Sequence, residues 1–234
     1  MNEKDRIEKI YIEREGGDDV KYSLRSSYGL FSHQSKVRAL RDVLESEKLL
    51  NTAADLKLLE VGCGKGGWFR VFEGFGFNLK NLSGIDLVEK YIETAKVIFP
   101  DVSLKTGDGT KLPWDNNTFD VVFQATVFSS ILKTETKMEL AAEMKRVCKS
   151  GGYIIWYDFI YNNPKNRDVR GVTVREIESL FSCGTKGVKT TLAPPIARKL
   201  VSASWGLASA LENFIPILRT HYMAAIRIDK SEAT

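Results

Sequence analysis

The stretch Leu56–Gly67, LKLLEVGCGKGG, decides the fold of this chain. It begins as a short apolar run and ends in a cluster of glycines. An apolar run of this length that stops at glycine is typical of a parallel strand buried on both faces. The glycines allow a sharp turn and a close approach of the backbone to a ligand at the start of a helix. The sequence therefore predicts a ligand-binding turn between a buried strand and a helix.

Similar apolar segments recur along the chain, and helical repeats separate them. The strand-like segments are 81–86, 102–108, 119–125, 151–159 and 221–228, and the helical ones are 68–75, 89–99, 135–149 and 173–181. Strands that alternate with crossover helices form a mostly parallel sheet covered by helices on both faces. We therefore expect an open α/β sheet of the Rossmann type, which binds its ligand beyond the carboxyl ends of the strands.

The composition is that of one compact domain with small appendages. The chain has 234 residues, of which 43% are hydrophobic and 27% charged, and this excludes a disordered protein. No uncharged run approaches the roughly 20 apolar residues of a transmembrane segment. The charged start, MNEKDRIEKI, is unlike a secretory signal, so we expect a cytoplasmic protein. The three cysteines are far apart in sequence and are expected to be separate reduced thiols.

We expect a helical N-terminal cap at 1–50, in which Ile7, Ile10 and Tyr11 share one face, and the main domain at 51–234. An insertion on the substrate side is expected at about 162–219. The stretch 164–200 has eight basic and three acidic residues, a net charge of +5, which favours an anionic substrate or partner. This density of lysine and arginine is too low for a duplex-DNA binder, so no nucleic acid is expected as a partner.

The insertion also contains an amphipathic stretch. We expect its apolar residues to pack in the core, with a substrate lid or a membrane contact as alternatives. These residues are Ile196, Leu200, Trp205, Leu207, Leu211 and Phe214.

The glycine cluster on its own fits two kinds of nucleotide site. Gly62, Gly64 and Gly67 have the GxGxxG spacing of dinucleotide-binding turns, while Glu60 followed by three alternating glycines has an acid-x-GxGxG spacing. Asp86, at the end of the second strand, fits either site because a carboxylate accepts two hydrogen bonds from ribose hydroxyls. These residues leave both kinds of cofactor open.

The segment Gly107–Trp114, GDGTKLPW, followed by the strand FDVV, favours one of the two. Together with LEVGCGKG and GIDL, it resembles the class I S-adenosylmethionine-dependent methyltransferases, in particular the subgroup that methylates quinones, sugars and natural products. The resemblance covers about Leu56–Phe159. It implies a seven-stranded sheet with an antiparallel last strand, and S-adenosyl-L-methionine as the cofactor. No cluster of acids and histidines suggests a metal site.

The resemblance also implies a set of cofactor-binding residues. Asp108 would hold the adenine amino group, and Glu60 would lie near the cationic ammonium of the methionine part. A pyrophosphate would instead be repelled by Glu60, since like charges repel. The expected cofactor-binding residues are Glu60, Gly62, Gly64, Gly66, Asp86, Leu87, Asp108, Gly109 and Gln124.

Methylation of a hydroxyl requires removal of its proton, and a general base typically contributes about 10²–10⁴-fold. His221, at the start of the last strand, and Asp158, just past the fifth, are the candidate catalytic residues. Tyr28 and Phe31 in the cap are aromatic candidates for a lid over the cofactor.

The tail segments NNPKNRDVRG, LAPPIARKL and LRTHY resemble a bacterial subgroup of surface-polysaccharide biosynthesis. We therefore expect O-methylation of a sugar or another small hydroxylated acceptor, such as an anionic nucleotide- or lipid-linked sugar. An NAD(P)-dependent oxidoreductase and a non-catalytic binding module of the same fold are the alternatives. The sequence leaves the oligomeric state open.

Overall fold

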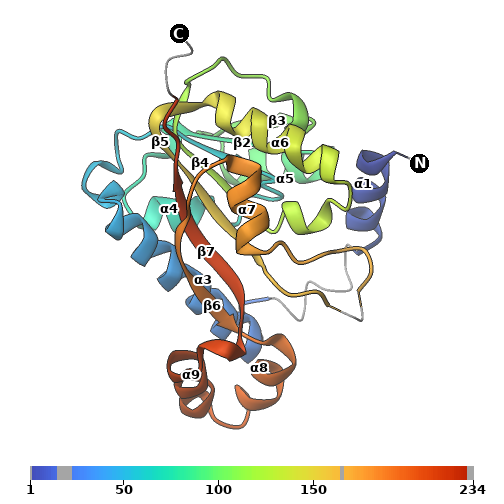
Figure 1. Cartoon of the computed structure of the whole chain (residues 1–234), viewed down its shortest axis with the longest axis vertical. Coiled ribbons are helices and arrows are strands. Elements are labelled where there is room, and N and C mark those ends of the chain that lie inside the picture. The colour runs from blue at the N-terminus through green and yellow to red at the C-terminus, as the bar shows by residue number, and fades with distance from the viewer. Residues whose placement is uncertain (1, 15–22, 164–165, 231–234) are drawn as a thin grey trace.

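One sheet organises the chain (Figure 1). In this computed structural model, which describes residues 2–14, 23–163 and 166–230, seven strands pair in the order β3-β2-β1-β4-β5-β7-β6. β7 is antiparallel to both of its neighbours, while β1 to β5 pair in parallel. The α/β sheet with an antiparallel last strand is therefore confirmed. The strands are β1 Leu58–Val61, β2 Leu82–Asp86, β3 Ser103–Thr106, β4 Phe119–Ala125, β5 Cys148–Phe159, β6 Lys186–Leu192 and β7 Arg219–Arg227.

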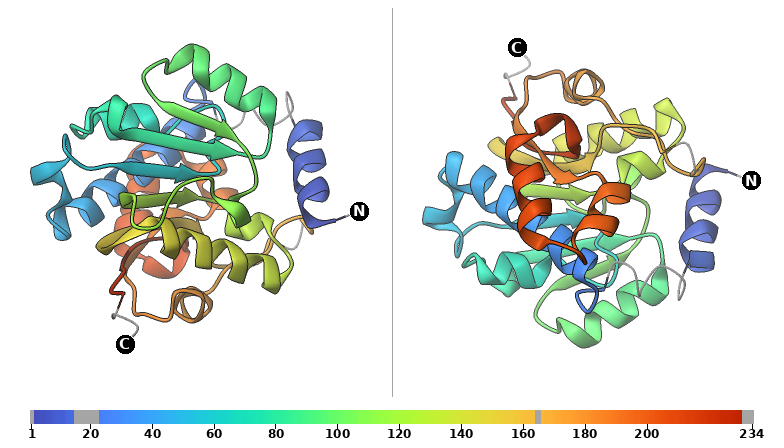
Figure 2. Two further views of the ribbon diagram at one scale, coloured as in Figure 1. Left: turned by 90° about the horizontal axis from the view of Figure 1, so that it is seen from above. Right: turned by 90° about the horizontal axis from the view of Figure 1, so that it is seen from below.

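Helices cover both faces of the sheet (Figure 2). α3, α4 and α5 pack on one face, and α6 and α7 pack on the other. Successive residues of a strand point to opposite faces, so Leu58 joins the first core and Leu59 the second. This double burial explains why β1 is apolar except for Glu60, which is itself buried. The helices are α1 Glu3–Arg14, α3 Ser27–Ser46, α4 Phe69–Gly74, α5 Glu89–Ile98, α6 Thr134–Val147, α7 Val174–Phe181, α8 Pro194–Leu200 and α9 Trp205–Phe214.

Strand β6 is the main element that the hydrophobic pattern of the sequence did not predict. It occupies Lys186–Leu192, KGVKTTL, inside the region expected to be an insertion. Its first four residues are exposed, and a polar edge strand carries little hydrophobic signal. The sheet therefore extends into the expected insertion, and the described residues 166–185 and 193–218 are parts of the insertion that lie outside the sheet.

Some expectations fall on parts of the chain that the structure does not describe. Positions 15–22 of the expected cap and positions 164–165 of the basic stretch are outside the described residues. The division into cap, main domain and insertion stays a prediction.

The three cysteines are free thiols, as expected, and Cys63 and Cys148 are buried. In the described parts of the chain, no helix has the length and apolar character needed to cross a membrane. Across these same residues, no group of three or more His, Cys, Asp and Glu side chains is arranged to hold a metal ion.

Gly84, in the middle of β2, leaves no room for a side chain. An added Cβ would lie 2.8 Å from Cys63 Sγ, 2.8 Å from Phe69 Cζ and 2.9 Å from Leu104 Cδ2. We expect Gly84→Ala to lower the free energy of unfolding by about 1–3 kcal/mol in urea denaturation, because the core would be overpacked. Gly74→Ala, where a Cβ would meet no atom within 4 Å, is the control and should cause no loss. Equal losses in the two variants would contradict this packing argument.

Candidate functional site

A cavity of about 460 Å³ lies at the carboxyl ends of β1 to β4. This is the edge of an α/β sheet at which ligands are expected to bind. The turns after the four strands form its floor, and α1, α5 and the start of α6 complete its walls. From the turns come Gly62, Gly64, Asp86, Leu87, Val88, Asp108, Gly109, Thr110, Ala125, Thr126 and Val127.

The glycine turn after β1 brings the backbone close to this cavity. Gly62 has φ +72°, and a Cβ at this position would lie 2.4 Å from Val127 Cγ2. Gly64 has φ +52° and no atom within 4 Å of its Cβ position, so its backbone is open to the cavity. Gly66 has φ +83°, but its Cβ position lies within 2.9 Å of the Phe69 and Phe99 rings. Gly66 therefore allows the chain to turn into α4 and does not line the cavity.

Asp86 links the turns after β1 and β2. Its Oδ2 accepts a hydrogen bond from the Gly64 N–H at 2.8 Å, and its Oδ1 accepts one from the Val88 N–H at 2.9 Å. Burial raises the pKa of Asp86, and these N–H donors counteract part of that effect. Each carboxylate oxygen has two lone pairs, so Asp86 keeps acceptor capacity for hydroxyls of a ligand in the cavity.

Asp108 lies near the start of the loop that follows β3. Its Oδ1 accepts hydrogen bonds from the Thr110 N–H and hydroxyl, both at 2.9 Å, which leaves Oδ2 to accept from a ligand. Arg146 of α6 fixes the rest of this loop by donating to the carbonyl oxygens of Leu112 and Trp114. The loop therefore presents Asp108 and Gly109 to the cavity in a fixed position.

Three of the predicted cofactor-binding residues lie behind the cavity wall. Gly66 is one of them, and Gln124 is fully buried, with Oε1 accepting from the Val127 N–H at 3.1 Å and Nε2 donating to the Tyr157 carbonyl at 3.4 Å. Gln124 thus holds the loop after β4 in place. The predicted residues that do line the cavity are Gly62, Gly64, Asp86, Leu87, Asp108 and Gly109.

Glu60 is the third residue behind the wall, and it is the group that fits a cationic ligand. It is 1% exposed, and no hydrogen-bond donor reaches its Oε2. Burial, and then the neighbouring Asp86 carboxylate, raise the pKa of Glu60 well above its usual value. A buried carboxylate oxygen without a partner is costly, so a cation bound close to it would be stabilised.

Helix α1 is a wall of the cavity that sequence analysis did not identify. Ile7 and Tyr11, predicted to share a helical face, both line the cavity. The helix is held by Glu3, which accepts from the Leu132 N–H at 2.6 Å, and by Arg6, which donates to the Ser130 carbonyl at 2.5 Å. Burial raises the pKa of Glu3, but hydrogen bonds from Arg6 and Leu132 outweigh it, so the pKa is lowered overall.

The aromatic lid expected in the cap is not at this site. Tyr28 and Phe31 pack in a separate cluster with Leu192 and α8. Their apolar pattern could not distinguish this cluster from the cofactor cavity, and α1 covers the cavity instead. Other lining residues that the sequence did not reveal are Tyr91, Thr126, Ser130, Lys133, Thr136 and Glu139.

The two candidate catalytic residues lie on opposite faces of the sheet, and neither lines the cavity. His221 is half-buried on the α3 face and stacks on Tyr157, with ring centroids 5.2 Å apart and planes at 6°. Burial, helped by Lys36, lowers the pKa of His221 to about 3. Asp158 is fully buried on the other face and accepts from the N–H groups of Ser129 and Phe159 at 3.0 and 2.9 Å.

Asp158 should make the stability of the fold depend on pH. Burial raises its pKa from 3.8 to about 7. The unfolded chain releases this proton near pH 4, whereas the folded chain retains it until about pH 7, so the free energy of unfolding falls as the pH rises through this range. An asparagine side chain at this position has no such proton to lose. Urea denaturation of Asp158→Asn should therefore show increasing stability relative to the parent between these pH values, and a constant difference above them.

The exposed Asp101→Asn is the control for replacing a carboxylate by an amide, and it should lack the gain in relative stability expected for Asp158→Asn. Parallel curves for Asp158→Asn and the parent would show that the Asp158 carboxyl does not hold its proton in the folded chain.

Comparisons with known proteins agree on the central part of the chain. Residues 59–156 match a family model described as a methyltransferase domain. A sterol 4-C-methyltransferase of Caenorhabditis elegans is 26% identical over 60% of this chain and 42% of its own length. A sarcosine/dimethylglycine N-methyltransferase of Aphanothece halophytica is 25% identical over 65% of this chain and 53% of its own length. The chain thus spans about half the length of these relatives.

A solved structure of an S-adenosylmethionine-dependent methyltransferase from Mesorhizobium loti has the same fold. The TM-score is 0.54 at 16% sequence identity, over 76% of this chain and 95% of that chain. At such low identity the likeness concerns the fold alone. The strand order and the antiparallel last strand are those of the class I methyltransferase fold.

Proposed function

Because residues 59–156 match a methyltransferase domain model and the sheet has the class I methyltransferase fold, we propose that this chain transfers a methyl group from S-adenosylmethionine to an oxygen of a sugar or another small hydroxylated acceptor. The observation that carries the methyl-donor part of the proposal is the set of carboxylates at the ends of β1, β2 and β3. Asp86 and Asp108 line the cavity beside the glycine turn, and Glu60 is buried directly behind the cavity wall.

These carboxylates match the polar groups of S-adenosylmethionine. Asp86 would accept hydrogen bonds from the ribose hydroxyls, and Asp108 would accept one from the adenine amino group. Glu60, whose Oε2 lacks a donor, would offset the positive charge of the ammonium. The bound donor supplies an activated methyl group on a sulfonium, and orientation of the acceptor can remove about 7–11 kcal/mol of the barrier in favourable cases.

The acceptor is proposed from the tail of the chain. The tail resembles a bacterial subgroup of surface-polysaccharide biosynthesis, and the net +5 of residues 164–200 suits a phosphate-bearing sugar, such as a nucleotide- or lipid-linked one. Such an enzyme would work in the cytoplasm. The names of the two relatives describe transfer to carbon and to nitrogen, so they favour no particular atom for this chain.

For removal of the acceptor proton we favour His221 over Asp158. His221 is neutral at pH 7 and partly exposed, so a ring nitrogen can accept a proton, while burial lowers its pKa and makes it a weaker base than a free imidazole. Asp158 is enclosed, and its two oxygens accept backbone N–H groups. Asp158 is therefore better suited to hold the turn Phe128–Ser130, which borders the cavity through Ser130.

Binding of S-adenosylhomocysteine tests the cofactor assignment. We expect calorimetry to detect it in the parent chain and to show an affinity at least about tenfold lower in Asp86→Ala, because the hydrogen bonds of a charged acceptor are worth about 1.5–3 kcal/mol each. Asp101→Ala, an exposed change away from the cavity, should bind like the parent.

NADH is the ligand that separates the rival functions. Tight binding of NADH without S-adenosylhomocysteine would favour the oxidoreductase. Binding of S-adenosylhomocysteine without turnover on any acceptor, together with retained function of Asp86→Ala in vivo, would favour a non-catalytic module.

A screen of nucleotide sugars and other hydroxylated molecules with isotopically labelled donor would identify the acceptor. On that acceptor, we expect His221→Gln to lower kcat by about 10²-fold with S-adenosylhomocysteine affinity unchanged, since a general base is lost. Asp158→Asn should keep kcat within about tenfold of the parent. A larger loss in Asp158→Asn than in His221→Gln would reverse the assignment.

A further inference from the structure

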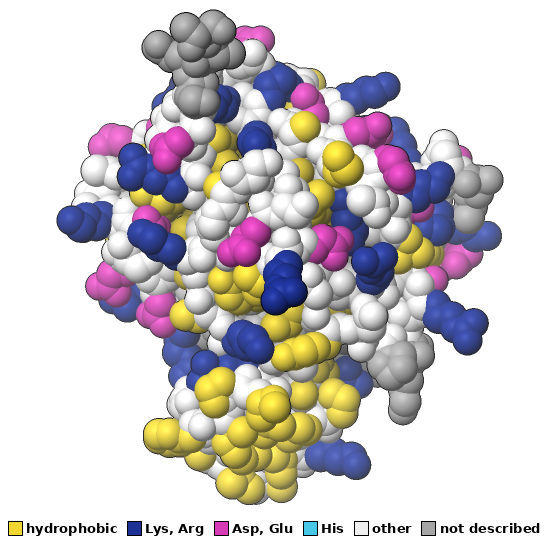
Figure 3. All heavy atoms as spheres, in the orientation of Figure 1, with side chains coloured by type: hydrophobic (Ala, Val, Ile, Leu, Met, Phe, Trp, Pro, Cys, Tyr) yellow, Lys and Arg dark blue, Asp and Glu magenta, His cyan; other side chains and the backbone are white. Residues whose placement is uncertain are grey.

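The segment from 193 to 218, called here the α8–α9 tip, exposes an apolar surface at one end of the molecule. Figure 3 shows hydrophobic side chains gathered at the bottom, where Figure 1 places α8 and α9. Phe214 is 83% exposed, Ile217 78% and Leu207 49%, and Trp205 and Ile215 are also partly exposed. A contiguous exposed apolar patch of this kind usually marks an interaction site. The expectation that the amphipathic stretch packs in the core is therefore wrong for Leu207 and Phe214.

The tip is a folded element with its own small core. Ala197, Val201 and Ala208 are buried against Tyr28, Phe31 and Leu192, and the inner residues Ile196, Leu200 and Leu211 pack on this cluster. Trp205 meets the Phe31 ring edge-to-face at 5.2 Å between centroids. Because the inner side of both helices already has its partners, the outer apolar side chains are not needed to hold the tip together.

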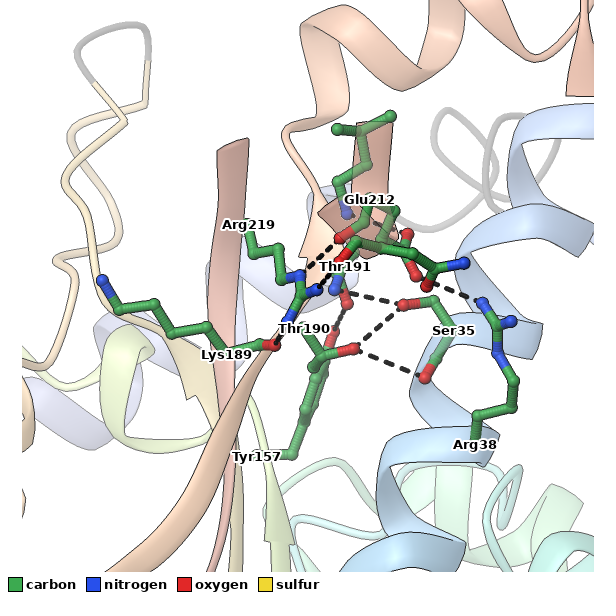
Figure 4. Close-up of polar contacts among 10 residues, drawn as sticks. Ser35, Arg38, Tyr157, Lys189, Thr190, Thr191, Glu212 and Arg219 are labelled. Carbon is green, nitrogen blue, oxygen red and sulfur yellow. Dashed lines mark hydrogen bonds and ion pairs between the residues drawn. The ribbon is translucent and has the colours of Figure 1, made fainter. Parts of the chain in front are cut away.

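Polar contacts fix the tip to the sheet (Figure 4). The Glu212 carboxylate accepts from the Leu192 N–H at 3.1 Å and from Arg38 of α3 at 3.2 Å. The Arg219 guanidinium donates to the carbonyl of Glu212 at 2.5 Å and to that of Asn213 at 2.7 Å. These contacts join α9 to β6, β7 and α3, so the apolar side chains are presented on a fixed support.

The exposed charges of the α8–α9 tip are positive, and they indicate what kind of partner it binds. Glu212 is the single acidic residue between 193 and 218, and it is 4% exposed. Arg198 and Lys199 of α8 are exposed, as is Lys189 of the adjoining β6. The outer surface of the tip therefore combines long apolar side chains with cations and presents no exposed carboxylate of its own.

We propose that the α8–α9 tip docks on the surface of an anionic lipid bilayer. Phe214, Leu207 and Ile217 would enter the boundary between headgroups and acyl chains, and Arg198 and Lys199 would contact the anionic headgroups. The tip projects from the body of the molecule (Figure 1), a convex form suited to a soft interface. Charge complementarity favours lipid over a second copy of this chain, whose tip would bring the same cations together.

The position of the tip relates this docking to the cavity. β7 is antiparallel to β5, so its first residue lies at the edge of the sheet where β1 to β5 end. The tip precedes β7 directly and therefore lies at the same edge as the cavity. The view from below in Figure 2 shows α8 and α9 facing the viewer, with α1, a wall of the cavity, at the side of the molecule. The tip is thus joined to the sheet at the edge that also carries the cavity.

Co-sedimentation with lipid vesicles tests the proposal. The full chain should bind vesicles of phosphatidylcholine mixed with phosphatidylglycerol, and at least about tenfold more weakly to phosphatidylcholine alone. The double variant Phe214→Ser, Ile217→Ser should lose at least about tenfold in binding. Val97→Ser on α5, whose side chain is 83% exposed like that of Phe214, is the matched control and should bind like the parent.

A second pair of variants, one test and one matched control, examines the role of the cations of the tip. Lys199→Glu should weaken binding to the mixed vesicles by about tenfold, whereas Lys96→Glu, exposed on α5, should have little effect. All four variants lie outside the cavity lining and should bind S-adenosylhomocysteine like the parent. Failure of the parent to bind that ligand would count against the proposed function and leave the vesicle result to be judged separately.

Two outcomes would overturn the docking proposal. One is absence of the parent chain from sedimented anionic vesicles. The other is a dimer in analytical ultracentrifugation that the Phe214→Ser, Ile217→Ser variant dissociates, since the apolar surface would then be an interface between copies of this chain.

Discussion

The carboxylate of Asp86 is the contact on which the geometry of the cavity depends. It joins two turns that are separated in sequence, because its oxygens accept the backbone N–H groups of Gly64 and Val88. This arrangement holds the glycine turn open and at the same time keeps a charged acceptor at the end of β2. Burial makes the charge of Asp86 costly, and a ligand rich in hydroxyl donors would lower that cost.

Buried polar side chains support the rest of the cavity from behind. Gln124 holds the Val127 N–H, and Asp158 holds the Ser129 N–H, so both act on the loop that follows β4. Arg146 does the same for the loop after β3. The residues that line the cavity are thus positioned by groups that a ligand never touches, which is how loops at the edge of a sheet become rigid enough to orient a small molecule.

Local patterns account for the parts of the molecule that the sequence predicted. Leu58–Val61 and Phe119–Ala125 are mostly apolar because both faces of each strand are buried, and the glycines and acids of the site lie at or just after the strand ends. Contacts between segments that are distant in sequence could not be predicted. The apolar face of α1 indicated that this helix packs on something, but not that it lines the cavity. β6 was not predicted because it is a polar edge strand with little hydrophobic pattern. That His221 and Asp158 face opposite sides follows from the pairing register of Phe159 with His221, which no sequence pattern gives.

The direction of β7 also determines where the described chain finishes. Lys230 lies at the far edge of the sheet, where its Nζ donates to Asn117 Oδ1 and to the Cys148 carbonyl, both at 2.6 Å. A fluorophore, an affinity handle or a solid support attached at this edge of the sheet would be remote from α1 and α9 alike. Molecules immobilised in this way would share one orientation, with the small-molecule entrance and the apolar end both turned toward the solution.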